Sequence, residues 1–384
     1  MALSCLFVVQ GEGRGHLTQA LSLRHTLTNA GHHVEEVVVG KSRCRAVPSF
    51  FQEALEEPVT FVDSPSFVPD GQDRSVRPWA TLVHELRRTP TFCRSLAAID
   101  AAVERHDPDV VVNFFEPLMG LYAMWRRPSF SIVAVAHQYM FLHPAYQFPP
   151  GWRVQRWATQ SLARLSSVGA TQRLALSLYP APDRPDKNLS VLPPLLRPDL
   201  FQRDIGRRGP FFLVYILNSG YADEVIRWHE RHPSVQLHCF WDRPDAAPVE
   251  TYDDTLAFHQ LDDQKFLDFM VRCRGFVSTA GFESIAEAMY LGTPVQVVPV
   301  EGHFEQHCNA FDTVRAGAGI RSPRFEVDRL QAFLPRYSDD GASFRTWVRR
   351  SRRRFVQEIE AAAGQSARSA PTPPYSEPEA LRAA

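Results

Sequence analysis

The sequence has 384 residues, six cysteines and a formal net charge of -1, and charged residues make up 22% of it. A chain of this length exceeds one ordinary domain and predicts two domains with sizeable cores. The balanced charge argues against nucleic acid as a partner and favours a small molecule. The cysteines are scattered, without the spacing of a zinc site, which indicates free buried thiols in a reducing compartment.

No segment approaches the roughly 18 consecutive apolar residues of a membrane-spanning helix. The N-terminal apolar stretch, residues 2–9, is short and follows no basic segment of the kind that begins a signal peptide. We therefore expect a cytoplasmic protein.

Short runs rich in Val, Ile and Phe alternate with longer helix-like segments, which predicts βαβ units and parallel sheets. Their nearly continuous hydrophobicity fits strands that are covered on both faces. We expect an N-terminal domain over residues 1–185. Its strands are predicted at residues 3–9, 34–39, 59–62, 110–115 and 130–134.

A proline-rich stretch at residues 180–198 predicts a connection between domains, which we place at residues 186–208. The same alternation of apolar runs and helix-like segments then begins again and predicts a second domain over residues 209–340. The predicted fold class is α/β, with two open sheets facing each other across a cleft. The strands of the second domain are expected at residues 211–220, 235–241, 255–261, 275–281 and 295–300.

The C-terminal region predicts one helix and a tail. Residues 341–362 include an amphipathic, arginine-rich helix, which we expect to pack on the N-terminal domain. Its clustered positive charge raises the hypothesis of peripheral contact with the inner face of a membrane. Residues 363–384 have the composition of a disordered tail.

A glycine-rich turn, GEGRGH at residues 11–16, follows the first predicted strand. Position 16, where a dinucleotide fingerprint has its third glycine, is histidine, and no acid ends the second strand. The turn also lacks the Gly-Lys-Ser/Thr of a Walker loop. What remains is a turn that allows close backbone approach, with His16 at the start of a helix. A neutral imidazole there suits a general base, although a histidine that only caps the turn fits the same residues.

A second turn lies near residue 281. A strand ends at Thr279, Gly281 turns the chain, and a helix begins at about Phe282, so that free N–H groups provide an anion site suited to phosphate. Ser284 adds a hydroxyl, and Glu287 suits hydrogen bonds to ribose. The alternative is that the glutamates at 283 and 287 form part of a solvated helix face.

The next strand is followed by the polar run EGHFEQHCNA at residues 301–310. Carboxylate and carboxamide groups there, Glu305 and Gln306 in particular, can bind several sugar hydroxyls at once. A dense polar loop after a buried strand is difficult to explain by packing.

With these motifs in this order, the sequence resembles glycosyltransferases of the two-Rossmann-domain (GT-B) type. The resemblance is to nucleotide-diphospho-sugar transferases related to the UDP-glucuronosyltransferases and the cell-wall GlcNAc transferase. It covers roughly residues 1 to 325, is strongest at 278–310, and is closest to bacterial and archaeal members. It implies that His16 is the catalytic base and that Glu116 holds its imidazole, with Asp109 the weaker candidate.

The resemblance also implies the binding residues. For the nucleotide and donor sugar these are Asn218, Ser219, Gly220, Thr279, Gly281, Ser284, Glu287, Glu305 and Gln306. On the acceptor side they are Gly13, Gly15, His137 and Gln138.

The sequence departs from plant and animal relatives at two positions. It has Thr279 where they place a diphosphate-binding histidine, and Glu283 where they place asparagine. Because an acid beside a diphosphate is unfavourable, we expect Glu283 to point elsewhere.

The expected reaction moves a sugar from a nucleotide-diphospho-sugar, UDP-linked by resemblance, to an acceptor hydroxyl. The transfer is predicted to invert the anomeric centre without a metal, and the nucleotide sugar is a co-substrate rather than a cofactor. The acceptor is expected to be a small molecule, a glycan or a lipid-linked compound. Two alternatives stay open: a nucleotide-sugar 2-epimerase and a non-catalytic nucleotide-sugar-binding protein.

Overall fold

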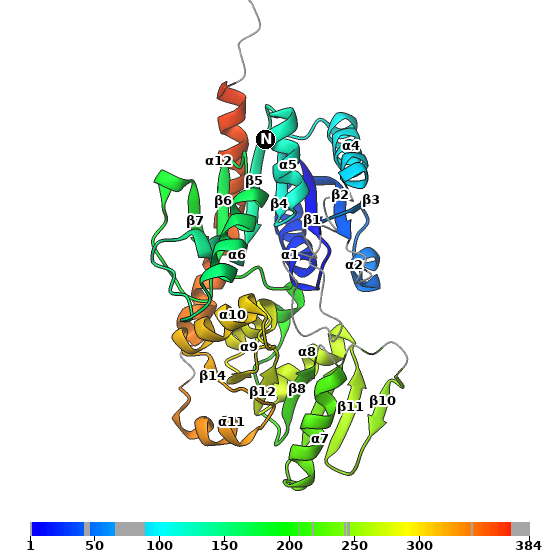
Figure 1. Cartoon of the computed structure of the whole chain (residues 1–384), viewed down its shortest axis with the longest axis vertical. Helices are drawn as coiled ribbons and strands as arrows, with labels where there is room; N and C mark the ends of the chain where they lie inside the picture. The colour runs from blue at the N-terminus through cyan, green and yellow to red at the C-terminus, as the bar shows by residue number, and fades with distance from the viewer. Residues whose placement is uncertain are drawn as a thin grey trace, which may run out of the picture.

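The computed structural model describes residues 2–41, 47–65, 89–206, 208–216, 219–241, 243, 246–338 and 341–369. The chain forms two seven-stranded sheets, one in each half (Figure 1). The first has the order β3-β2-β1-β4-β5-β6-β7, with all neighbours parallel. Its strands are β1 (Ser4–Gln10), β2 (His33–Lys41), β3 (Val59–Asp63), β4 (Val110–Phe114), β5 (Ser131–Ala136), β6 (Gln172–Leu176) and β7 (Leu189–Leu192).

Helices cover both faces of this sheet. Alternate residues of β1 enter two different cores: Phe7 and Val9 pack with α1 and α12, whereas Leu6 and Val8 pack with α4 and α5. The strands are therefore buried on both sides, as their continuous hydrophobicity predicts. Among the described residues, the helices of this half are α1 (Gly15–Asn29), α2 (Ser49–Glu53), α4 (Thr89–His106), α5 (Pro117–Arg126) and α6 (Arg153–Ser166), with short 3-10 turns at η1 (His137–Leu142), η2 (Pro185–Lys187) and η3 (Pro198–Gln202).

The second sheet has the order β10-β11-β9-β8-β12-β13-β14, in which only β10 is antiparallel to its neighbour within the described residues. Its strands are β8 (Phe212–Ile216), β9 (Leu237–Trp241), β10 (Val249–Thr251), β11 (Leu256–Gln260), β12 (Gly275–Ser278), β13 (Val295–Val297) and β14 (Gly319–Arg321). Its helices are η4 (Ser219–Tyr221), α7 (Ala222–Glu230), α8 (Asp263–Arg272), α9 (Phe282–Tyr290), α10 (Phe304–Arg315), α11 (Asp328–Phe333) and η5 (Leu334–Arg336).

The predicted fold of two Rossmann-like domains is confirmed, and all ten expected strands are present with shifted ends. Four more strands, β6, β7, β10 and β14, were not predicted. β7 lies inside the expected linker of residues 186–208, so the first sheet extends to Leu192. Its four buried residues are flanked by prolines, which concealed a strand too short to show a pattern.

The chain returns to the first domain through α12 (Gly341–Ser369), which lies along it in Figure 1. The Ser131 hydroxyl donates a hydrogen bond to the Ala362 carbonyl at 2.6 Å, and the Gln172 amide donates to Glu358 at 2.9 Å. Residues 363–369, expected in the tail, continue this helix, and the remainder of the expected tail lies outside the described residues. No helix in the described ranges is both long and apolar enough to cross a bilayer.

Two helical glycines make a matched test of packing between α5 and α6. A Cβ at Gly120 would overlap the backbone oxygen of Leu165, whereas a Cβ at Gly364 of α12 would meet nothing within 4 Å. We expect Gly120→Ala to lower the free energy of unfolding by about 1–3 kcal/mol through overpacking. Gly364→Ala should instead raise it by up to about 1 kcal/mol, because alanine favours the helix. Thermal or urea unfolding measures both, and equal effects would contradict the α5–α6 packing.

Candidate active site

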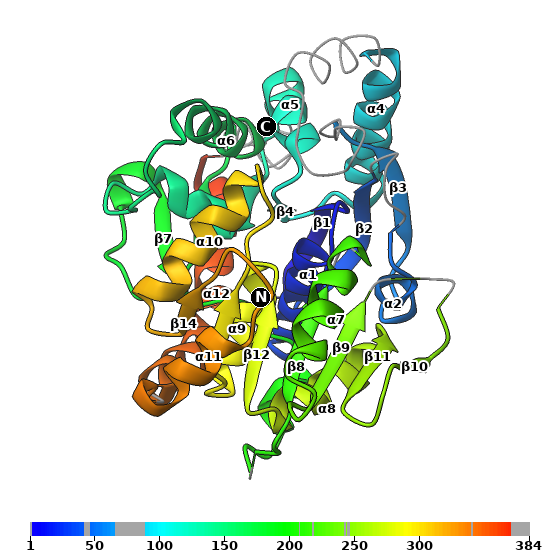
Figure 2. The ribbon, with the colours of Figure 1, turned by 60° about the horizontal axis from the view of Figure 1, so that its bottom comes forward.

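The domains meet where the glycine-rich turn of the first sheet faces the start of α9. A Cβ at Gly15 would lie 3.6 Å from the Glu283 side chain, and Arg14 forms an ion pair with Asp263 at 2.6 Å. Figure 2 shows α1 beside the elements of the second domain. At this point the domains are in direct contact, so the predicted cleft is closed here. Gly13 has a φ of 92°, which favours glycine in the turn.

His16 lies in the first turn of α1, as predicted, and is buried. Its ring stacks on Phe115, with the centroids 5.6 Å apart. Burial lowers the pKa of His16 to about 4; the nearby His137 acts in the same direction, and Glu305 opposes it. The imidazole is therefore neutral at pH 7 in this arrangement, which is the form that accepts a proton.

A hydrogen-bonded chain reaches His16 from the other domain. The Gln19 amide donates to the Glu283 carboxyl at 2.5 Å, and the Gln19 oxygen lies 3.3 Å from Nδ1 of His16. With the Gln19 oxygen as acceptor, Nδ1 carries the ring proton and Nε2 is left with a lone pair. Glu283 thus points at the first domain, whereas the sequence predicted only that it would not face the diphosphate. Burial raises the pKa of Glu283 to about 8.

The other side of His16 faces the polar residues expected at the acceptor and sugar. Nε2 of His16 lies 3.4 Å from the Gln138 amide nitrogen, which also donates to Glu305 at 3.3 Å. His137 lies 3.3 Å from Glu305 and stacks on Phe282 at 4.5 Å. Burial alone would raise the pKa of Glu305, but the hydrogen bond and charge of His137, together with His303 and His16, more than offset it and lower that pKa to about 2. The site residues His16, His137, Gln138 and Glu305 are therefore brought together.

Glu116 is placed elsewhere. It caps α5: one carboxylate oxygen accepts hydrogen bonds from the Leu118 N–H at 3.1 Å and the Ser64 hydroxyl at 2.7 Å. The other oxygen packs against Gly40. The expected contact with His16 is absent from the hydrogen bonds described for these two residues. The unsatisfied N–H groups at the helix start draw the carboxylate back onto its own turn, and Gln19 takes the position expected for Glu116.

The start of α9 is as the sequence predicted. Gly281 is the N-cap, Ser284 lies in the first turn with its hydroxyl donating to the Gly281 carbonyl at 3.2 Å, and Thr279 is buried in the preceding turn. The unpaired N–H groups of this turn make a positively polarised site. Its geometry suits an anion.

Glu287 is buried one turn further along α9 and is held by Arg197. Nε of Arg197 lies 2.5 Å from one carboxylate oxygen, and a terminal nitrogen lies 3.1 Å from the other. Both oxygens predicted to bind ribose therefore already accept charge-assisted hydrogen bonds, and a ribose must share them with the guanidinium.

The other residues predicted to bind the nucleotide sugar are Gln306 and residues 218–220. Gln306 is in the first turn of α10, but its amide oxygen accepts from the Val300 N–H at 2.9 Å and so fixes the preceding loop. Ser219 and Gly220 form the turn η4 after β8, where the predicted strand would have continued. Asn218 lies outside the described residues.

Gln19 and Arg197 were not predicted from the sequence. Gln19 is three residues after His16 on a predicted helix, so helical spacing alone places the two side chains on one face. Arg197 carried no such signal, because it lies in a proline-rich segment far from Glu287 along the chain.

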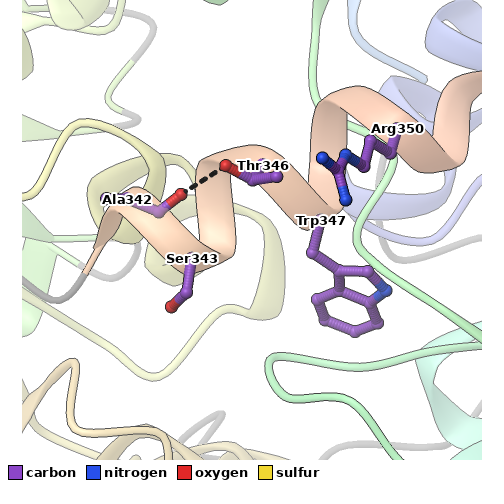
Figure 3. A pocket seen from close by; sticks show the side chains of 5 residues that line it. All are labelled: Ala342, Ser343, Thr346, Trp347 and Arg350. Atoms are coloured by element: carbon purple, nitrogen blue, oxygen red, sulfur yellow. Dashed lines mark hydrogen bonds between the residues drawn. The ribbon is translucent and has the colours of Figure 1, made fainter.

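Two hollows occur away from these residues. One, of about 530 Å³, lies on the first turns of α12 and is lined by Ala342, Ser343, Thr346, Trp347 and Arg350 (Figure 3). Another, of about 170 Å³, lies between α12 and residues 178–180 and 316–318. None of the predicted site residues lines either of them. Among the described residues, no group of three or more histidine, cysteine or acidic side chains is placed to hold a metal ion.

The buried cap predicts a pH-dependent stability. Burial raises the pKa of Glu116 to about 7. The folded protein therefore holds a proton that the unfolded chain loses above a pKa of about 4.5, so stability falls as pH rises from 4.5 to 7. Glu116→Gln keeps an acceptor oxygen without the charge. At pH 4 the free energies of unfolding of this variant and of the parent should be nearly equal. By pH 8 the value for the variant should exceed that of the parent by roughly 3 kcal/mol. A difference that does not change between pH 4 and pH 8 in thermal unfolding would contradict this.

The comparisons with known proteins agree with this geometry. Residues 3–337 match the family model described as glycosyl transferase family 1. No curated protein sequence matches the chain.

Similar solved structures include the glycosyltransferase of kitacinnamycin (18% identity, 94% of this chain and 100% of that one, TM-score 0.62). The spinosyn forosaminyltransferase SpnP is also similar (16% identity, 95% of this chain and 100% of that one, TM-score 0.61). Phytolacca americana UGT2, complexed with UDP-2fluoro-glucose and pterostilbene, is a third similar structure (14% identity, 96% of this chain and 96% of that one, TM-score 0.58). At these identities the likeness concerns the fold, whereas the family match spans both domains. The chain is therefore a glycosyltransferase of GT-B architecture that belongs to glycosyl transferase family 1.

Proposed function

We propose that this enzyme transfers a sugar from a UDP-linked donor to an acceptor hydroxyl, with inversion and with His16 as the base. The observation that carries the proposal is the chain His16–Gln19–Glu283, which joins the base to the first turn of α9. The diphosphate is assigned to the N–H groups at Gly281, and their dipole offsets the charge of the leaving group. The proposal needs no metal for that purpose.

The chemistry of His16 follows from its contacts. Gln19 holds the proton on Nδ1, and Nε2 presents its lone pair on the side of Gln138 and Glu305. An acceptor hydroxyl that replaces the Gln138 amide at Nε2 gives up its proton there as its oxygen attacks the anomeric carbon from the face opposite the diphosphate. Direct displacement of this kind inverts the anomeric centre.

Substrates need access to residues that are now buried between the domains. We propose that the domains separate at the Gln19–Glu283 and Arg14–Asp263 contacts and close again on bound donor. Glu305, in the first turn of α10, is assigned to sugar hydroxyls, and Glu287 to ribose together with Arg197.

The choice of UDP rests on relatives. Phytolacca americana UGT2 holds UDP-2fluoro-glucose, and LpCGTa (14% identity, TM-score 0.60) holds UDP. A small-molecule acceptor is supported in the same way by the pterostilbene of that UGT2 structure. For location, the described cysteines are all free thiols, which supports the cytoplasm.

Nucleotide selectivity tests the donor assignment. Thermal unfolding with UDP, GDP, ADP, CDP and dTDP should show the largest stabilisation with UDP, about 2.7 kcal/mol when the ligand is a hundredfold above its Kd. UDP release from UDP-sugars in the presence of acceptors then measures transfer. A larger shift with another base would overturn the choice of UDP, and the absence of any shift would overturn the site at Gly281.

Three variants test the base and its positioning residue. His16→Ala should lower kcat by about 10²–10⁴-fold with little change in UDP affinity. Gln19→Leu should lower kcat less and should change the pH profile of kcat/KM, because the tautomer of His16 is no longer fixed. Glu116→Gln, a buried change that removes no contact with His16, should keep its turnover at neutral pH.

The results separate three outcomes. A strong loss of kcat in Glu116→Gln, with the fold intact by circular dichroism, would restore Glu116 as the residue that orients His16. Near-normal turnover in His16→Ala would remove the histidine from the mechanism. An unchanged pH profile in Gln19→Leu would reduce Gln19 to a packing role.

A further inference from the structure

One long segment of the first domain carries no acidic residue. Between Pro117 and Pro182 the sequence has six arginines and neither aspartate nor glutamate, although acids and bases are nearly equal in number over the whole chain. This segment includes α5, α6 and the 3-10 turn η1. Such a local excess of positive charge favours an anionic partner.

The most exposed apolar side chains of the described residues lie on one helix of this segment. Val154 is 70% exposed and Trp157 is 69% exposed, and as i and i+3 residues they share a face of α6. Arg153 and Arg156 each directly precede one of these residues, on the adjacent face of the same turns, and are also exposed. No ion pair is described for either arginine, although Arg156 also lies over the Phe148 ring.

This part of α6 borders the site. Trp152, its N-cap, packs on Phe304 and His307 of α10, with ring centroids 5.8 and 4.7 Å away. Phe304 directly precedes Glu305, which contacts His137 and Gln138. Figure 2 shows α6 beside α10. The exposed apolar and basic turns of α6 are therefore next to the expected acceptor side.

We propose that the first two turns of α6, residues 153–158, dock on an anionic lipid bilayer. Tryptophan is suited to the boundary between headgroups and acyl chains, where Trp157 and Val154 would lose contact with water. Arg153 and Arg156, on the adjacent face of the helix, then reach anionic headgroups. A soluble anionic partner would explain the arginines but would not require the exposed apolar pair beside them.

The arginine-rich helix α12 is the less suitable surface. Arg349 donates a hydrogen bond to the Tyr290 hydroxyl at 2.8 Å, Arg345 donates to the Tyr290 carbonyl at 3.2 Å, and Arg354 forms an ion pair with Asp183. Several of its cations therefore stabilise the packing of α12. Its exposed arginines at 350 and 353 provide a matched control.

Flotation with lipid vesicles tests the proposal on the full chain. The protein should float with vesicles of phosphatidylcholine mixed with phosphatidylglycerol, should float poorly with phosphatidylcholine alone, and should lose binding as salt rises. Replacing Arg153 and Arg156 together by glutamate should weaken binding by about 25-fold or more, from about fivefold for each arginine. Val154→Ser with Trp157→Ser should also weaken it, with tryptophan fluorescence no longer shifted by vesicles.

The control is the double variant Arg350→Glu and Arg353→Glu, which makes the same change in net charge on α12 and should keep binding within about twofold. Loss of binding in this control, with the α6 variants unaffected, would overturn the assignment to α6. Failure of the parent protein to float with anionic vesicles would overturn membrane docking altogether. UDP-induced stabilisation, measured on every variant, reports on folding and on the donor site independently of lipid.

Discussion

The hydrogen bond between Gln19 and Glu283 is the contact on which the arrangement of the active site depends. It joins α1 of the first domain to α9 of the second, where Gln19 is buried and Glu283 is half-buried. Burial raises the pKa of Glu283 to about 8, so the carboxyl is held uncharged at neutral pH. An uncharged group can be buried between domains at a moderate cost, and can be exposed again when they separate. Because the closed form holds a proton that the exposed carboxyl loses above a pKa of about 4.5, closure weakens as pH rises from about 4.5 to about 8.

The charge of Glu287, the second carboxylate of α9, is stabilised by an ion pair. Glu287 is buried against Arg197, which comes from the segment that connects the domains. Removal of one partner from such a pair costs about 3–5 kcal/mol, because the other charge stays buried without compensation. The orientation of the donor helix is thus tied to the connecting segment, so a change in the connection would be felt at the nucleotide site.

The sequence predicted those strands and helix starts that depend on residues close together along the chain. The ten main strands follow from hydrophobic runs, and the two helix starts at His16 and Gly281 follow from the glycine turns before them. The strands β7 and β14 were missed because each is short and is stabilised by its neighbours in the sheet. Contacts between residues more than 200 positions apart, such as Gln19 with Glu283, have no local signal. For Glu116, the local requirement of capping α5 outweighed the expected role at His16.

The base needs a negative charge nearby once it has accepted a proton, and the structure offers Glu305 rather than Glu116. Burial lowers the pKa of His16 to about 4, which keeps the ring neutral but makes protonation costly. Glu305 acts in the opposite direction on that pKa, and its own pKa of about 2 keeps it ionised. Glu305 belongs to the second domain and lies next to Gln138 of the first. An imidazolium at His16 is therefore stabilised only while the domains are together, which couples proton transfer to closure over the donor.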